Sequence, residues 1–201
     1  MFYLLDPFLK NGFFYIPLQF MIRHYNFYVI TGGPGVGKTT LINGLAKAGY
    51  RTIGENAREI IKEQIRSNGE ALPWKNKELY TQLMLKASAE SFRSASECKD
   101  LVFFDRGILD AFCYAHIIGM DISDDMNDMA AACLYNPKVF ILPPWKEIYE
   151  TDHERKQSWK EAVETYNMMK STYSKYGYEL IEVPFDTPEN RIEFILNAIE
   201  R

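Results

Sequence analysis

Short apolar runs alternate with longer amphipathic segments along most of the chain. Runs of strand length lie at residues 27–30, 51–54, 101–104, 139–142 and 178–183, and the first, third and fourth are apolar throughout. The segments between them repeat apolar residues at intervals of three and four, as amphipathic helices do. We expect helices at about residues 38–48, 57–68, 77–96, 109–118, 124–135 and 154–173, and a last one from Pro188. Buried strands that alternate with helices predict one α/β domain, with a parallel sheet covered on both faces.

Residues typical of helix ends support these bounds. Gly49, Gly69 and Gly177 follow three of the expected helices, where a glycine in the left-handed conformation is common. Thr187 before Pro188 is a typical helix start. In the last helix, the residues expected to face inward are Ile192, Ile195, Leu196 and Ile199.

The composition narrows the class of protein. The 201 residues carry a formal net charge of −4, which gives no basic surface of the kind that nucleic acids require. Cys98, Cys113 and Cys133 are odd in number and lack CxxC spacing, which argues against a disulfide framework or a zinc site. They favour a reducing, cytoplasmic compartment. We therefore expect neither nucleic acid nor a membrane as a partner, and the sequence is silent on the oligomeric state.

Residues 1–24 form an N-terminal extension ahead of the domain pattern. They are rich in Phe, Tyr and Leu, but polar residues interrupt them too often for a transmembrane helix, and the basic start of a signal peptide is missing. Two interpretations are open: a strand or hairpin added to the domain, or a start codon placed too early, with Met21 the natural beginning. We favour the second, because residues 25–201 account for the whole domain pattern.

A glycine-rich turn between the first strand and the first helix carries the clearest functional signal. It reads Gly32-Gly33-Pro34-Gly35-Val36-Gly37-Lys38-Thr39-Thr40 and matches the spacing of a phosphate loop in the strand–turn–helix context that the motif requires. The glycines let backbone N–H groups surround phosphates at a helix N-terminus. Lys38 supplies a charge to the β and γ phosphates, and the Thr39 hydroxyl is placed for magnesium. The sequence therefore predicts binding of ATP with Mg²⁺.

Asp105 ends the third apolar run and has the position of a Walker B carboxylate. The carboxyl ends of parallel strands face the ligand crevice, so Asp105 could hold magnesium through water or orient an acceptor hydroxyl. Arg106 follows directly and could reach a phosphate. The alternative is structural: Asp105 caps the next helix, and Arg106 makes a surface ion pair.

Glu55 follows the second expected strand and precedes a helix. It is either a carboxylate that caps this helix or a general base that anchors an acceptor hydroxyl beside the γ phosphate. Arg58, one turn further along, could hold the acceptor. Trp74 could stack on a ring of the acceptor, although packing is the commoner use of such a residue.

A polar segment at residues 143–156 follows the fourth strand and is a candidate lid. An arginine that closes over the phosphates would neutralise their charge during transfer and exclude water. We expect Arg155 to have this role, with Lys156 as the second choice. The alternative is a structured connector in which residues 151–154 form a capping box.

These motifs together resemble the predicted ATPases that are grouped with the kinase domain of bacterial nicotinamide riboside kinases. The similar stretches are residues 26–40, 55–61, 104–107, 143–145, 154–157 and 177–179. The resemblance covers residues 25–201 and implies a three-layer P-loop NTPase fold, with a five-stranded parallel sheet in the order 2-3-1-4-5. In related deoxynucleoside kinases a glutamate after the second strand serves as base and an Asp-Arg pair follows the third. Glu55 and Asp105-Arg106 match those places, whereas no residue is assignable to nicotinamide recognition.

The expected function is a small-molecule, nucleoside-like kinase that transfers the γ-phosphoryl group of ATP to an unidentified hydroxyl. Its predicted catalytic residues are Lys38, Glu55, Asp105, Arg106 and Arg155. The alternative is a regulatory ATPase or GTPase-type switch without a phosphorylated acceptor. A guanine-reading N-K-x-D motif is not met, because Asn76-Lys77-Glu78-Leu79 fails at its last position.

Overall fold

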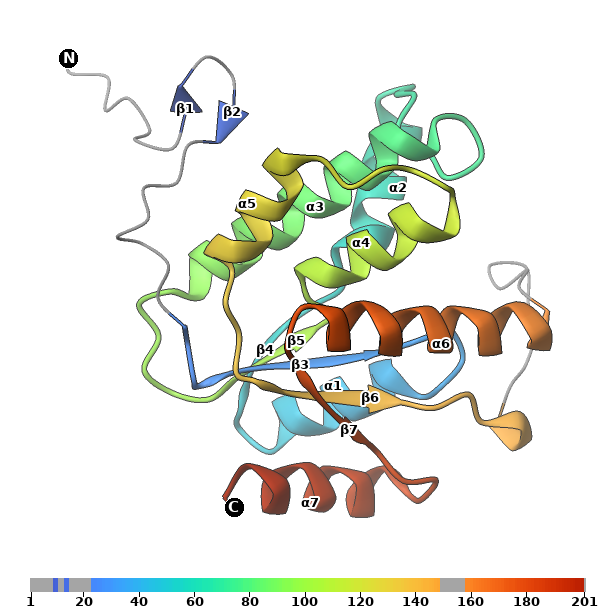
Figure 1. Cartoon of the computed structure of the whole chain (residues 1–201). Helices are drawn as coiled ribbons and strands as arrows, with labels where there is room; N and C mark the ends of the chain where they lie inside the picture. The colour runs from blue at the N-terminus through green and yellow to red at the C-terminus, as the bar shows by residue number, and fades with distance from the viewer. Residues whose placement is uncertain (1–8, 11–12, 15–22, 149–157, 201) are drawn as a thin grey trace.

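A five-stranded parallel sheet forms the centre of the computed structural model, which describes residues 9–10, 13–14, 23–148 and 158–200 (Figure 1). Its strands are β3 (Phe27–Gly32), β4 (Arg51–Ile53), β5 (Val102–Asp105), β6 (Lys138–Leu142) and β7 (Glu179–Glu182). They lie in the order β4-β5-β3-β6-β7, and each neighbouring pair is parallel. Numbered along the domain, this order is 2-3-1-4-5, so the predicted P-loop fold is confirmed. A separate antiparallel pair, β1 (Leu9–Lys10) and β2 (Phe13–Phe14), precedes the sheet.

Helices cover both faces of the sheet (Figure 1). On one face lie α1 (Lys38–Lys47) and α7 (Pro188–Ile199), which contact each other. The other face carries α3 (Lys77–Ala95), α4 (Ile108–Ile117), α5 (Asp124–Ala132) and α6 (Trp159–Lys175). The helix α2 (Asn56–Arg66) packs on α3, and a short 3-10 helix, η2 (Lys146–Ile148), follows β6. Within the described residues, no helix combines the length and apolarity needed to cross a bilayer.

Two cores separated by the sheet explain why its central strands are apolar on both faces. Phe103 points into the core that contains Leu45 and Ile195, under α1 and α7. Its neighbour Phe104 points into the larger core, where it contacts Phe27. Both phenylalanines are at most 1% exposed. Burial of such a side chain contributes about 1.5–3 kcal/mol, so the two faces together fix the register of β5 and the place of Asp105 at its end.

Several helix ends differ from the predicted ones. The helix α5 ends at Ala132, three residues before the expected end at 135. At the end of α2 the left-handed residue is Asn68, with φ 53°, and not Gly69 as predicted. The helix α6 begins at Trp159, after a capping box formed by Ser158 and Glu161. The first residues expected for this helix, 154–157, and the alternative capping box at 151–154 lie outside the described residues.

Residues ahead of position 25 contact the domain, and β2 lies against α5. Arg23 donates from Nη1 to the carbonyl of Tyr135 at 2.8 Å, and the His24 ring stacks on Phe27 with centroids 4.4 Å apart. Most of the extension lies outside the described residues, so the start at Met21 stays a prediction.

Candidate active site

The phosphate loop lies between the carboxyl end of β3 and the start of α1. Its last glycine, Gly37, has φ 81° and serves as the N-cap residue of α1, so the first N–H groups of this helix face the loop. The first, Gly32, has φ 147°, and a side chain there would meet the Leu142 carbonyl at 2.8 Å. Both positions therefore require glycine. Lys38 begins the helix and is only 7% exposed.

Arg191, in the first turn of α7, forms a hydrogen bond to the backbone of the phosphate loop. Its Nη1 donates to the carbonyl of Val36 at 3.2 Å, and its guanidinium lies 5.6 Å from the centre of the Trp145 ring. A side chain at Gly37 would come within 2.9 Å of the same nitrogen. Arg191 is 3% exposed, and its Nε and Nη2 are buried without a hydrogen-bond partner. No acidic side chain in the described part of the chain forms an ion pair with it. Among the described residues, this buried cation has no counter-charge.

Asp105 lies beside Lys38 because β5 pairs with β3. In the register of these strands, Asp105 is level with Ile30, just before the phosphate loop. Its Oδ1 is 3.7 Å from Lys38 Nζ, but this oxygen is buried and accepts no hydrogen bond from any described residue. Burial raises the pKa of Asp105, and Lys38 and Arg106 oppose this shift only in part. Burial also lowers the pKa of Lys38. Asp105 does not cap the next helix, since that role belongs to Asp110.

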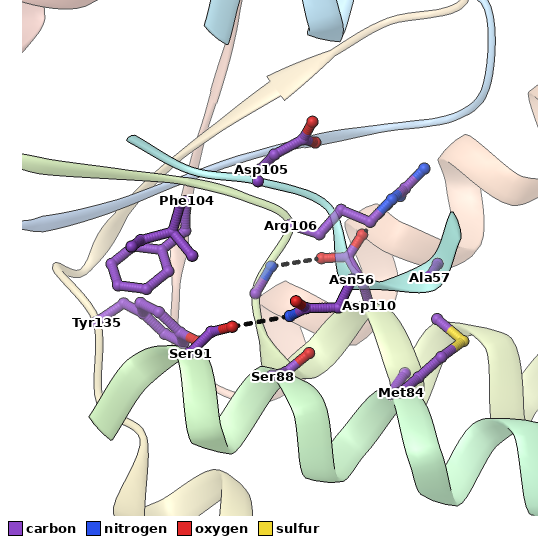
Figure 2. Close-up of a pocket in the computed structure, with 14 residues that line it drawn as sticks. Asn56, Ala57, Met84, Ser88, Ser91, Phe104, Asp105, Arg106, Asp110 and Tyr135 are labelled. Carbon is purple, nitrogen blue, oxygen red and sulfur yellow. Dashed lines mark hydrogen bonds and ion pairs between the residues drawn. The ribbon is translucent and has the colours of Figure 1, made fainter. Parts of the chain in front are cut away.

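Arg106 follows β5, and its side chain contacts residues at the carboxyl ends of β3 and β4. Its φ of 76° is unusual for a residue with a side chain, and such a conformation costs about 1–3 kcal/mol. The turn directs Nε to Glu55 Oε1 at 2.8 Å and Nη1 to the Gly32 carbonyl at 3.2 Å. The side chain is 18% exposed, so the alternative of a surface ion pair is wrong. Figure 2 shows the side chains of Asp105 and Arg106 extending to the same side of the strand end, away from Phe104.

Asp110 fixes Arg106 from within the core. Its Oδ1 accepts from Arg106 Nη1 at 2.9 Å and from Thr31 Oγ1 at 2.7 Å. Its Oδ2 accepts from the N–H of Gly107 at 2.9 Å and from the hydroxyl of Tyr173 at 2.7 Å. This carboxylate is 4% exposed and is satisfied by four donors. A fully bonded buried network of this kind is rigid, so Asp110 holds the guanidinium of Arg106 in one position.

Glu55 occupies the N-cap position of α2, but its side chain makes no capping hydrogen bond. The carboxylate instead faces Arg106, and its Oε2 is 3.9 Å from Arg58 Nε. Burial alone would raise the pKa of Glu55, but Arg106 and Lys38 outweigh it, and the pKa lies below its ordinary value. Glu55 is therefore an ionised carboxylate at neutral pH, able to accept a proton or a hydrogen bond.

Two clefts meet at the phosphate loop. The larger, of about 980 Å³, is lined by residues 33–40 together with Glu55, Arg58, Ile61, Lys62, Pro73, Trp74, Arg106 and Ile148. The smaller, of about 430 Å³, lies on the side of α7 and is lined by Gly37, Thr40, Leu41, Trp145, Ile148, Asp186, Thr187, Pro188 and Arg191. Both volumes are in the range of small-molecule sites. Gly37, Thr40 and Ile148 line both, so one elongated ligand could occupy the two clefts.

Residues 27–191 match a family of proteins described as an AAA domain. The chain belongs to this AAA domain family. No curated protein matches it. Among solved structures, deoxyadenosine kinase from M. mycoides with the products dCMP and dCDP bound is 19% identical, with a TM-score of 0.57 over 87% of this chain and 98% of that one. NadR in complex with NR is 16% identical, with a TM-score of 0.62 over 87% of this chain and 50% of NadR.

A third structure similar to this AAA domain is thymidylate kinase from Ehrlichia chaffeensis. It is 14% identical, with a TM-score of 0.55, and the match covers 86% of this chain and 97% of that enzyme. At such low identities these similarities establish a shared fold, the P-loop kinase fold, and leave the substrate open.

The AAA domain brings most of the predicted site residues together. Lys38, Glu55 and Arg106 line the same cleft as the phosphate loop, and Asp105 contacts Lys38. Arg155 and Lys156 lie outside the described residues, so a lid arginine stays a prediction. Arg191 and Asp110 were not among the site residues predicted from the sequence. Arg191 could have been found, because it lies four residues before Ile195 on the inward face of α7, where a charge is out of place.

Proposed function

We propose that this protein is a small-molecule kinase that transfers the γ-phosphoryl group of ATP to a hydroxyl acceptor. The observation that supports this best is the place of Glu55. An ionised carboxylate, held by Arg106, lines the same cleft as Lys38 and the phosphate loop. Transfer to a hydroxyl needs a group that orients this hydroxyl and accepts its proton, and Glu55 is a carboxylate in the cleft where an acceptor would bind.

The phosphate loop and α1 would hold the triphosphate of the donor. The residues present fit a magnesium ion, because Asp105 Oδ1 is buried without a hydrogen-bond partner and Thr39 offers an exposed hydroxyl beside the loop. Mg²⁺ is commonly bound by one or two protein groups together with phosphate oxygens. Such an ion would neutralise part of the charge of the phosphates. Asp105 and Thr39 are the residues that we expect to hold it.

The smaller cleft would receive the base of the nucleotide. It opens from Gly37 and Thr40, and its walls carry Trp145 and Pro188 as apolar surfaces for a flat ring. Asp186 lies at its edge and accepts from the N–H of Thr187 at 2.7 Å. ATP bound in this way leaves the larger cleft to the γ phosphate and the acceptor.

In the transfer step, the acceptor hydroxyl would lie between Glu55 and the γ phosphate. Its oxygen attacks the γ phosphorus, its proton passes to the Glu55 carboxylate, and the bond from the γ phosphorus to the bridging oxygen breaks as ADP departs. Lys38 and Arg106 are placed to stabilise negative charge on the phosphoryl group in transit. Asp110 acts through Arg106 as a positioning residue.

Arg191 would position the loop itself. The C=O and N–H of one trans peptide group point in opposite directions. When Arg191 Nη1 donates to the Val36 carbonyl, the Gly37 N–H of the same peptide group points away from Arg191. A triphosphate at the loop would also supply a negative charge, which Arg191 does not meet among residues 23–148 and 158–200.

The proposal is tested by ATP turnover with and without a panel of nucleosides, vitamins and sugars. We expect one class of compound to stimulate turnover and to appear as a phosphorylated product in mass spectrometry. Glu55→Gln should lower kcat by about 100-fold or more, in the range of general-base catalysis, with little change in the dissociation constant of ATP. Turnover that needs no acceptor and is unaffected by Glu55→Gln would instead support a regulatory ATPase.

A further inference from the structure

The charges that line the larger cleft are strongly unbalanced. Lys38, Arg58, Lys62 and Arg106 contribute positive charges, and Glu55 is the only acidic side chain among the described residues that line it. The whole chain, in contrast, has a net charge of −4. The positive lining is therefore a local feature of this cleft and is opposite in sign to the protein as a whole.

The donor nucleotide accounts for only part of this charge. Lys38 is buried beside Asp105 at the start of α1, where the β and γ phosphates would lie. Arg106 is bound to Glu55 and Asp110. Arg58 and Lys62 also line the cleft, and they lie four residues apart on α2 and so on one face of this helix.

The side chains of these two cations are largely exposed to water. Lys62 Nζ is 2.7 Å from Glu59 Oε1, but both side chains are at least 70% exposed. Arg58, with a side chain 56% exposed, is 3.9 Å from Glu55. Ion pairs exposed to water contribute only about 0.2–1 kcal/mol. A bound phosphate or carboxylate, shielded in the cleft, would be a stronger partner than either glutamate.

An apolar and aromatic surface lies beside the two cations. Ile61 lies between them in the sequence, and Pro73 and Trp74 come from the segment between α2 and α3. Trp74 is 64% exposed, so its indole is not used to build the core. An exposed ring of this kind next to cations suits a flat ligand that carries an anionic group.

We propose that the phosphoryl acceptor itself carries a phosphate monoester or a carboxylate, which Arg58 and Lys62 bind while a ring or sugar of the acceptor packs on Trp74. This inference rests on the kinase function proposed above. Along α2, Lys62 lies about 10 Å from Glu55, given a rise of about 1.5 Å per residue. The reacting hydroxyl and the anionic group of the acceptor are then separated by roughly 5–10 Å. A ligand with a cationic ring, such as nicotinamide riboside, is disfavoured by the same charges.

The test compares acceptors that differ only in charge. The pairs are ribose and ribose 5-phosphate, thymidine and dTMP, and nicotinamide riboside and nicotinic acid riboside, so that phosphate and carboxylate are examined separately. We expect the anionic member of at least one pair to have a kcat/KM about 10-fold or more above that of its partner. Phosphorus NMR of the product should show the new ester on a hydroxyl.

Variants then separate anion binding from general damage. Arg58→Gln with Lys62→Gln should lower kcat/KM for the anionic acceptor by about 10-fold for each cation, and leave the KM of ATP and the rate with the neutral partner nearly unchanged. The control, Lys47→Gln with Lys175→Gln, removes the same charge at the exposed ends of α1 and α6. It should leave kcat/KM unchanged.

The outcomes distinguish this inference from the kinase function. If neutral acceptors are phosphorylated at least as well as anionic ones, or the double variant slows both equally, the inference is wrong and the kinase function stands. A product in which the acceptor's own phosphate received the phosphoryl group would also overturn it. If ATP binds but no member of any pair, nor any compound of the wider panel, is phosphorylated, the kinase function itself fails.

Discussion

Replacement of Arg191 by methionine should change stability and nucleotide affinity independently. Arg191 is 3% exposed and donates to the Val36 carbonyl, and two of its donor nitrogens have no hydrogen-bond partner within the part of the chain that the structure describes. A buried charge without a partner destabilises the folded state. Within the described residues, the guanidinium of Arg191 is such a group, and it is bonded to the backbone of the phosphate loop. We therefore expect Arg191→Met to leave the free energy of unfolding of the unliganded protein nearly unchanged or higher. The same substitution should weaken binding of the triphosphate.

The structure sets the size of both effects. Exchange of buried charges for apolar residues of similar volume has been neutral or stabilising by about 1–4 kcal/mol. Loss of the bond to Val36 and of the contact with Trp145 opposes this by roughly 1–3 kcal/mol. A phosphate oxygen that accepts from Gly37 N–H would lie within about 8 Å of the guanidinium. At an effective dielectric constant of about 20, one unit charge at that distance is worth about 2 kcal/mol, or about 30-fold in affinity.

The assay combines urea unfolding without ligand and calorimetric titration with ATP and with adenosine. We expect the free energy of unfolding to stay within about 1 kcal/mol or to rise, ATP affinity to fall by about 10–30-fold, and adenosine affinity to change little. Arg191→Lys should recover most of the ATP affinity, and Arg51→Met removes a positive charge at the start of β4 as a control. Equal losses for ATP and adenosine, together with a clear loss of stability, would refute this account and show that Arg191 only supports the fold.

Three further predictions concern the walls of the site. Lys38→Ala should raise the dissociation constant of ATP by about 100-fold or more, since it removes a buried charge–phosphate contact; unchanged binding in fluorescence titration would reject the site. Burial raises the pKa of Asp105, so Mg²⁺-dependent ATP binding should decline as pH falls through this raised value, and the decline should be absent in Asp105→Asn, which binds weakly throughout. Tyr173→Phe removes one donor to Asp110 and should lower stability by about 1–2 kcal/mol. It should also reduce kcat several-fold at unchanged ATP affinity, and an unaffected kcat would exclude a positioning role for this network.

The sequence was sufficient for the sheet and for the phosphate loop. Strands such as β5 are apolar on both faces, and only a sheet covered on both sides satisfies that pattern. The parallel arrangement then brings Glu55 and Asp105 to one edge, because both follow carboxyl ends of neighbouring strands. The strand order itself came from the resemblance to a known family, since periodicity does not determine which strands are neighbours.

Features that depend on tertiary contacts were not predictable in this way. The left-handed residue after α2 is Asn68 and not Gly69, since asparagine also tolerates that conformation. The role of Asp110 depends on donors from β3, α6 and the turn before α4, which are distant in sequence. The left-handed backbone of Arg106 has no signature in the residue type, because arginine rarely adopts it.

Three departures from ordinary protein chemistry lie around one loop, and this clustering is itself an argument about function. Arg106 has a strained backbone. Asp105 has a buried oxygen, and Arg191 two buried nitrogens, that find no hydrogen-bond partner among the described residues. Each destabilises the unliganded protein, and local rules are usually broken at functional sites. Bound metal would provide a partner for Asp105, and bound triphosphate would provide negative charge for Arg191. Nucleotide with magnesium should therefore raise the melting temperature, and Arg191→Met should show a smaller rise at the same concentrations.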